Sequence, residues 1–129
     1  MPFVRITVPR SLKEEIPHLI SQSIHQALME AFNVPENDYF HIIESIAQEN
    51  IKYPKEYLGI LHTDNIVYIQ IIAAIGRTKE QKKKLYQKTT KLITSKTTIN
   101  PSDIIIVLTE NAKENWSFGN EILQYFNHI

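Results

Sequence analysis

The chain has 129 residues, no cysteine, and a formal net charge of zero from 14 basic and 14 acidic side chains. The balanced charge argues against a nucleic-acid-binding protein that depends on neutralising phosphates. The lack of cysteine excludes disulfides, thiolate nucleophiles and cysteine-based zinc sites. Neither a signal-peptide pattern nor an apolar run long enough to span a bilayer is visible. We therefore expect a single cytoplasmic domain over residues 1–129 that does not bind membranes.

The first part of the sequence predicts a strand, a helix and a second strand. We expect the strand over 3–8, the helix from about 12 to 32, a turn over 33–38 and the second strand over 39–46. Ser11 followed by Glu14 is a capping-box pattern that would start the helix. Pro17 conflicts with a regular helix at this point. Either the first turn is distorted or the helix begins near Pro17.

The second part repeats this pattern after a long connection over 47–65 that has room for one short hairpin. We expect a strand over 66–75, a helix after Thr78, a turn over 100–103 and a strand over 104–108. Thr78 with Gln81 is again a capping-box pattern. The predicted inner face of this helix consists of Leu85, Tyr86, Thr89, Leu92 and Ile93. The lysines on its other side predict a solvated face.

These two parts form an internal repeat, with pseudo-repeats over about 2–46 and 65–110. Arg10 precedes the first helix as Arg77 precedes the second, and the turn over 34–38 matches that over 99–103. Each β-α-β unit forms a right-handed crossover. The predicted fold is therefore an α/β (α+β) domain, in which a four-stranded sheet carries two helices on one face. The later strands are apolar on both faces, which predicts a homo-oligomer that buries the open face of the sheet.

Several segments carry a resemblance to a known family. They are the Met1-Pro2 start, Asp38 after Val34-Pro35, Tyr57-Leu58-Gly59-Ile60, Gly76-Arg77-Thr78-Lys79-Glu80-Gln81-Lys82, and Glu114-Asn115-Trp116-Ser117-Phe118-Gly119-Asn120. Together they resemble the tautomerase superfamily, in particular the branch containing malonate semialdehyde decarboxylase, over residues 2–120. The resemblance implies a homotrimer of β-α-β-β-α-β subunits. It also implies chemistry on an N-terminal proline, a small carbonyl acid as substrate, and no cofactor.

Pro2 is the first candidate catalytic residue that the resemblance implies. Removal of Met1 would leave a secondary amine, and an α-amino group has a reference pKa of about 7.7–8.0. An apolar pocket would favour its neutral form, which can take a proton from a carbon next to a carbonyl. The alternative is that Pro2 merely opens an edge strand.

Arg77 and Asp38 complete the candidate catalytic set. A guanidinium before a helix N-terminus can bind a carboxylate or stabilise an enolate, although a surface arginine paired with a nearby acid would look the same. The resemblance gives Asp38 an orienting or tuning role. Because Asp103 holds the same place in the other repeat, a turn role for Asp38 is the alternative.

The candidate substrate-binding residues are Trp116, Phe118, Arg10 and His41. Trp116 and Phe118 match the family's aromatic pocket wall, although plain packing would also explain them. Arg10 is the repeat equivalent of Arg77, and His41 stands where relatives often have an amide side chain. The five histidines show no zinc-ligand spacing, so we expect no metal.

The predicted function is a tautomerase acting on a small keto-enol carboxylic acid. The decarboxylase pattern has arginines at the positions of Ile75 and Arg77, and this chain keeps only the second. We therefore expect keto–enol tautomerisation and weak decarboxylation of malonate semialdehyde. The alternatives are a malonate-semialdehyde-type decarboxylase or hydratase and, in another class, a non-catalytic trimeric binding protein.

Overall fold

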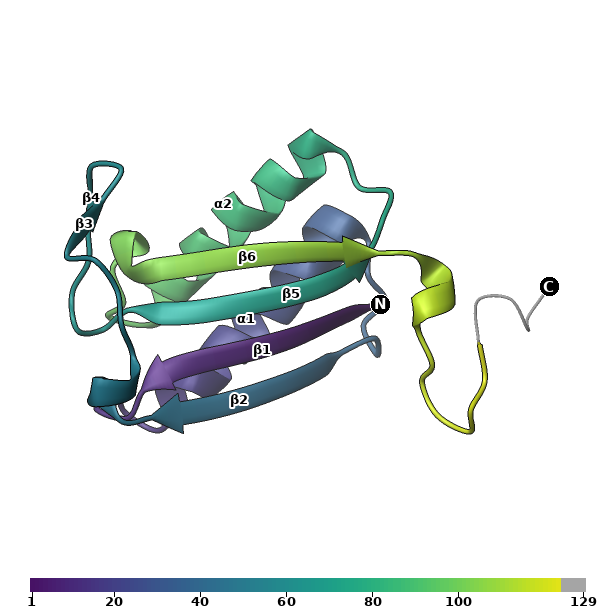
Figure 1. Ribbon diagram of the computed structural model, residues 1–129. Helices are drawn as coiled ribbons and strands as arrows, with labels where there is room; N and C mark the ends of the chain where they lie inside the picture. Colours follow the sequence, from purple (N-terminus) through teal and green to yellow (C-terminus); the bar gives the residue numbers. More distant parts are fainter. Residues whose placement is uncertain (124–129) are drawn as a thin grey trace.

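The chain folds into two β-α-β units that share one sheet (Figure 1). The computed structural model describes residues 1–123. The first unit comprises β1 (Pro2–Pro9), α1 (Glu15–Phe32) and β2 (Phe40–Ile46), and the second comprises β5 (Val67–Ala74), α2 (Lys79–Lys96) and β6 (Ile104–Asn111). Between them lie η1 (Gln48–Asn50), β3 (Glu56–Tyr57) and β4 (Ile60–Leu61), while η2 (Pro101–Asp103) and η3 (Lys113–Asn115) flank β6.

The strand order is β2-β1-β5-β6, with a parallel pair at each side and an antiparallel pair in the centre. Pro2 lies opposite Ala73, so the start of β1 meets the end of β5. Both helices cover the same face of the sheet (Figure 1). The predicted fold class is therefore confirmed.

The core lies between the sheet and these two helices. Its fully buried side chains include Val4, Ile6 and Val8 of β1, Val67, Ile69 and Ile71 of β5, Ile20, Ile24 and Leu28 of α1, and Leu85 and Ile93 of α2. Each such burial stabilises the fold by about 1.5–3 kcal/mol. Alternate β5 side chains such as Gln70 point away from the helices, so within one chain this strand is fully covered on one face only.

The two helices begin differently. Helix α1 starts after Glu14 without a side-chain cap, so the Ser11–Glu14 capping box is wrong. Pro17 is the third helical residue, where a backbone N–H has no partner in the helix, so it is tolerated. Helix α2 has the predicted capping box: Gln81 N donates to Thr78 Oγ1 at 3.1 Å, and Thr78 N donates to Gln81 Oε1 at 2.8 Å.

Two predictions about α2 need correction. Tyr86 is exposed rather than inner, because it follows Leu85 by about 100° around the helix. The lysine face is only partly solvated, since two of its lysines form ion pairs. Lys82 Nζ lies 2.6 Å from Glu110 Oε1, and Lys88 Nζ lies 3.2 Å from Glu30 Oε1.

The connection over 47–65 contains the short hairpin, formed by β3 and β4. Its turn places Leu58 and Gly59 at φ 52° and 81°, as a two-residue hairpin of the primed type requires. The left-handed conformation costs a leucine about 1–2 kcal/mol. Leu58 is 82% exposed, and Tyr57 and Leu61 are also exposed, so the hairpin presents apolar side chains outward.

Candidate active site

A cavity of about 420 Å³ opens at one end of the sheet. Its lining combines Met1, Pro35 and Asp38 from the first half with Ala74, Ile75, Gly76, Arg77, Gln81 and Lys113 from the second half. Figure 1 shows the N-terminus at the same end of the sheet as the end of β6 and η3. Two candidate catalytic residues, Asp38 and Arg77, therefore line one cavity, directly beside Pro2.

The antiparallel centre of the sheet explains this gathering. Because β1 and β5 run in opposite directions, the start of β1 and the loop after β5 lie at the same end. Strand β2 is parallel to β1, so Asp38, two residues before β2, also lies at that end. Each half therefore contributes different members of the site.

Asp38 holds the amino terminus of the chain. The Met1 ammonium group donates to Asp38 Oδ2 at 2.6 Å, with the Met1 side chain buried and the Asp38 side chain 21% exposed. Pro2 is buried directly behind this contact, and its nitrogen is bonded to Met1. The cavity thus contains the N-terminal ammonium group of the chain in contact with the Asp38 carboxylate.

Arg77 is fixed in position before it meets any ligand. Its guanidinium donates to the carbonyl oxygens of Ala74 at 3.1 Å and Phe32 at 3.4 Å, and lies 4.9 Å from the centre of the Phe32 ring. Gly76 has φ +124°, a conformation that a side chain rarely adopts and that lets the chain turn between β5 and Arg77. A guanidinium has five N–H donors, so about three remain for a carboxylate.

Trp116 and Phe118, the predicted aromatic wall, lie in the segment that follows β6. The rings of Trp116 and Phe118 are stacked with centroids 5.5 Å apart, and Phe118 packs on Phe40 at 5.2 Å. Trp116 Nε1 donates to Asn111 Oδ1 at 2.5 Å, which joins the segment after β6 to the sheet. Neither Trp116 nor Phe118 is among the described residues that line the cavity, so their role as a pocket wall stays a prediction.

Arg10 lies at the opposite end of the sheet. It follows the last residue of β1, and its backbone N–H donates to the Ile46 carbonyl at 2.8 Å. Arg10 comes eight positions after Pro2 along an extended strand, which is roughly 26 Å at 3.3 Å per residue. Within one chain, Arg10 therefore does not reach the cavity that Arg77 lines.

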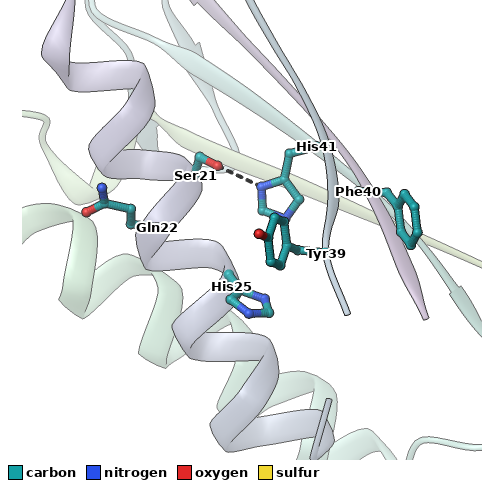
Figure 2. Close-up of a pocket in the computed structure, with 6 residues that line it drawn as sticks. All are labelled: Ser21, Gln22, His25, Tyr39, Phe40 and His41. Atoms are coloured by element: carbon teal, nitrogen blue, oxygen red, sulfur yellow. Dashed lines mark hydrogen bonds between the residues drawn. The ribbon is translucent and has the colours of Figure 1, made fainter. Parts of the chain in front are cut away.

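His41 faces a different hollow, of about 540 Å³, between α1 and β2 (Figure 2). Its Nδ1 lies 2.7 Å from Ser21 Oγ, and His25 Nε2 donates to the Glu36 carbonyl at 2.7 Å. Burial, with a smaller effect from neighbouring His25, lowers the pKa of His41 to about 4. Because Val4, its β1 partner, points into the core, His41 also points toward the helices rather than to the cavity.

Lys113 of η3 also lines the cavity, although the sequence did not predict it. No motif marks this lysine, because only the turn after β6 brings it to the end of β5.

The described residues 1–123 contain no cluster of three or more histidine or acidic side chains suited to a metal ion. His128 lies outside the described residues. In the described part of the chain, no helix is long and apolar enough to cross a membrane.

The fold and the cavity define a small β-α-β protein with an amine, a carboxylate and a guanidinium at one sheet end. Residues 38–119 match the protein family described as tautomerase enzyme. The probable tautomerase YusQ of Bacillus subtilis (strain 168) is 38% identical over 120 residues, covering 93% of this chain and 94% of YusQ. The probable tautomerase YrdN of the same organism is 26% identical over 119 residues, covering 92% of each.

Solved structures agree with these relatives. The FG41 malonate semialdehyde decarboxylase inhibited by 3-bromopropiolate has a TM-score of 0.92 and 28% identity, covering 98% of this chain and 95% of that one. A fused 4-OT symmetric trimer has a TM-score of 0.75 at 13% identity, covering 93% and 94%, and this likeness shows the fold alone. The chain belongs to the tautomerase family and is an isomerase of the tautomerase type.

Proposed function

We propose that this tautomerase interconverts the keto and enol forms of a small oxo acid, using Pro2 as its acid–base group once Met1 is removed. Arg77 binds the substrate carboxylate, and Asp38 orients the amine or a water molecule. The observation that carries this proposal is the antiparallel β1–β5 pairing, which places the amino terminus, Asp38 and Arg77 around one cavity.

The proton transfer is simple to balance. The neutral Pro2 nitrogen takes a proton from the carbon next to the carbonyl, breaking a C–H bond and forming an N–H bond. The electron pair moves onto the carbonyl oxygen, where a positioned guanidinium stabilises the developing negative charge. The ammonium of Pro2 returns its proton to give the enol, and the reverse sequence restores the ketone.

Two measurements test the proposal together. The intact mass of the natively expressed protein should correspond to a chain without Met1. The proposed role requires this, because the Pro2 nitrogen is a non-basic amide while Met1 is attached. The processed protein should ketonise enol phenylpyruvate in an ultraviolet assay, and Pro2→Ala should be far slower. Undiminished turnover by protein that retains Met1 would contradict the role of the amine.

We also propose a homotrimer, and we keep the cytoplasm as the expected compartment. The open sheet face carries partly exposed Ile72 and Ile105 and exposed Val107, while the β3–β4 hairpin exposes further apolar side chains. Contiguous apolar surface of this kind is typical of subunit contacts. Light scattering after size exclusion should give the mass of three chains, and a stable monomer at micromolar concentration would contradict the trimer.

Decarboxylation of a malonate-semialdehyde-like acid is the second candidate reaction, supported by the likeness to the FG41 enzyme. Ile75, which lines the cavity and is 58% exposed, offers no second guanidinium to fix the carboxylate for loss as carbon dioxide. We expect Ile75→Arg to raise decarboxylation relative to tautomerisation when both substrates are assayed on one preparation. Efficient decarboxylation by the unmodified protein would reverse this order.

A further inference from the structure

We propose that Lys113 is a second carboxylate-binding residue of the cavity, acting with Arg77 on the same substrate carboxylate. This inference rests on the proposed function of the cavity. It assigns a specificity role to a side chain that no sequence motif marks.

The backbone after β6 holds Lys113 at the cavity. Asn111, the last residue of β6, lies opposite Ala74 and accepts a hydrogen bond from Ile75 N at 2.9 Å. The Asn111 side chain accepts the bond from Trp116 Nε1, which closes the chain around η3. The residues before and after this short helix are therefore joined through Asn111, which is itself hydrogen-bonded to the segment that carries Arg77, and Lys113 lines the same cavity.

The charge of Lys113 has no partner among the described residues. Its nearest preceding acid in sequence, Glu110, is occupied by Lys82 at 2.6 Å. Asp38, the acid that lines the cavity, faces the amino terminus, 2.6 Å from the Met1 ammonium, and within residues 1–123 no ion pair joins it to Lys113. Within residues 1–123, Arg77 and Lys113 are the cationic side chains of the lining, and Ile75 contributes only apolar surface. An anionic group of the substrate would therefore supply the negative charge that no described side chain offers to Lys113.

The two cations are suited to different tasks. Arg77 is held by two carbonyl oxygens and presents a planar fork. Lys113 is exposed and carries a point charge on a flexible stem. Arg77 therefore sets the orientation of the carboxylate, whereas Lys113 adds attraction that is sensitive to salt. We expect Lys113 to affect KM more than kcat.

The test compares an acid with its uncharged ester. Lys113→Met should raise KM for phenylpyruvate about 3–10-fold, the effect of a partly screened charge-assisted hydrogen bond, and should leave KM for methyl phenylpyruvate unchanged. Lys113→Arg should restore most of the loss. Lys91→Met, an exposed change of the same charge on α2, is the matched control and should have no effect. An unchanged KM for the acid, or an equal change for the ester, would overturn the role of Lys113.

A binding titration separates this inference from the proposed function. Calorimetry with 3-phenylpropanoate, which has no keto group, should show the same 3–10-fold loss of affinity in Lys113→Met. If this loss is seen but the processed wild type does not turn over phenylpyruvate, the acid–base function fails and the carboxylate contact stands. Equal affinity of wild type and Lys113→Met, or no binding to either, overturns the inference about Lys113 whatever the turnover.

Discussion

Asp38 and Asp103 occupy equivalent positions before β2 and β6, yet their surroundings differ. Asp103 is fully buried and accepts hydrogen bonds from Thr63 N at 2.7 Å and Thr63 Oγ1 at 2.6 Å, which hold the connection before β5. Asp38 is partly exposed at a cavity and contacts a charged amine. An aspartate at the same place in each repeat thus has two roles. Asp103 stabilises the fold at one end of the sheet, whereas Asp38 faces a cavity at the other end.

Arg10 and Arg77 show the same division. Both follow the first strand of their half, but the antiparallel centre of the sheet sends them to opposite ends. The cavity end receives the amino terminus and Asp38 from the first half and Arg77 from the second. The two β-α-β units therefore contribute different residues to one cavity, rather than each forming an equivalent cavity of its own.

The largest effect is expected from blocking the amino terminus, the group that only the cavity end of the sheet contains. Two extra residues before Pro2 would keep its nitrogen in an amide and remove a general base. We expect kcat to fall by about 10²–10⁴-fold, measured by ketonisation of phenylpyruvate. The same two residues added at the C-terminus are the control and should leave kcat unchanged. Equal rates for the two extended proteins would show that the amine is not the catalyst.

The second prediction compares the two arginines. Arg77→Ala should cost about 1.5–3 kcal/mol of transition-state stabilisation, or roughly tenfold to a hundredfold in kcat/KM for a carboxylated substrate. Arg10→Ala should leave kcat/KM within about twofold, because Arg10 lies at the opposite end of its own sheet from the cavity. Circular dichroism checks that both variants are folded. Equal losses in the two variants would show that Arg10 also reaches a site, and in a trimer only an arginine of a neighbouring subunit could do so.

The third prediction separates the two acids by stability. Asp103→Asn replaces one fully buried carboxylate oxygen with an amide N–H, so one of the two hydrogen bonds from Thr63 is lost and the free energy of unfolding should fall by about 1–3 kcal/mol. Asp38→Asn should lower it by less, because its carboxylate is partly exposed, but should reduce kcat. Urea unfolding and the ketonisation assay measure the two quantities. If Asp103→Asn loses turnover while its free energy of unfolding is unchanged, the structural role assigned to Asp103 is wrong.

The smallest effect concerns His41, whose repeat equivalent is the apolar Ile106. The folded pKa of about 4 lies below the ordinary value of 6.5, so the unfolded chain binds more protons between these values. Stability should therefore fall as the pH drops from about 6.5 to 4, by about 1–2 kcal/mol after allowance for partial exposure. His41→Gln should flatten this slope in urea titrations at several pH values. Exposed His18→Gln is the control, and equal slopes in both variants would exclude His41 as the cause.

The sequence predicted most elements of the fold because its local patterns agree with tertiary packing. The Thr78–Gln81 capping box formed, while Ser11 and Glu14 carried the same pattern without forming one, since α1 begins only at Glu15. The cavity required knowledge of strand direction, which no local pattern encodes. Lys113 was not found from the sequence, because its place depends on the turn after β6. His41 was assigned to the site, but the side of the sheet that it faces depends on the register with β1.

The fixed position of Arg77 has a thermodynamic consequence. An arginine side chain that becomes ordered on binding loses up to about 1.5–2 kcal/mol of rotamer entropy. Arg77 has already lost much of that freedom through its two carbonyl contacts and the Phe32 ring, so the entropy loss is part of folding rather than of ligand association. Carboxylate binding through Arg77 should therefore have a small unfavourable entropy, while the contribution of the flexible Lys113 should show the larger enthalpy–entropy compensation.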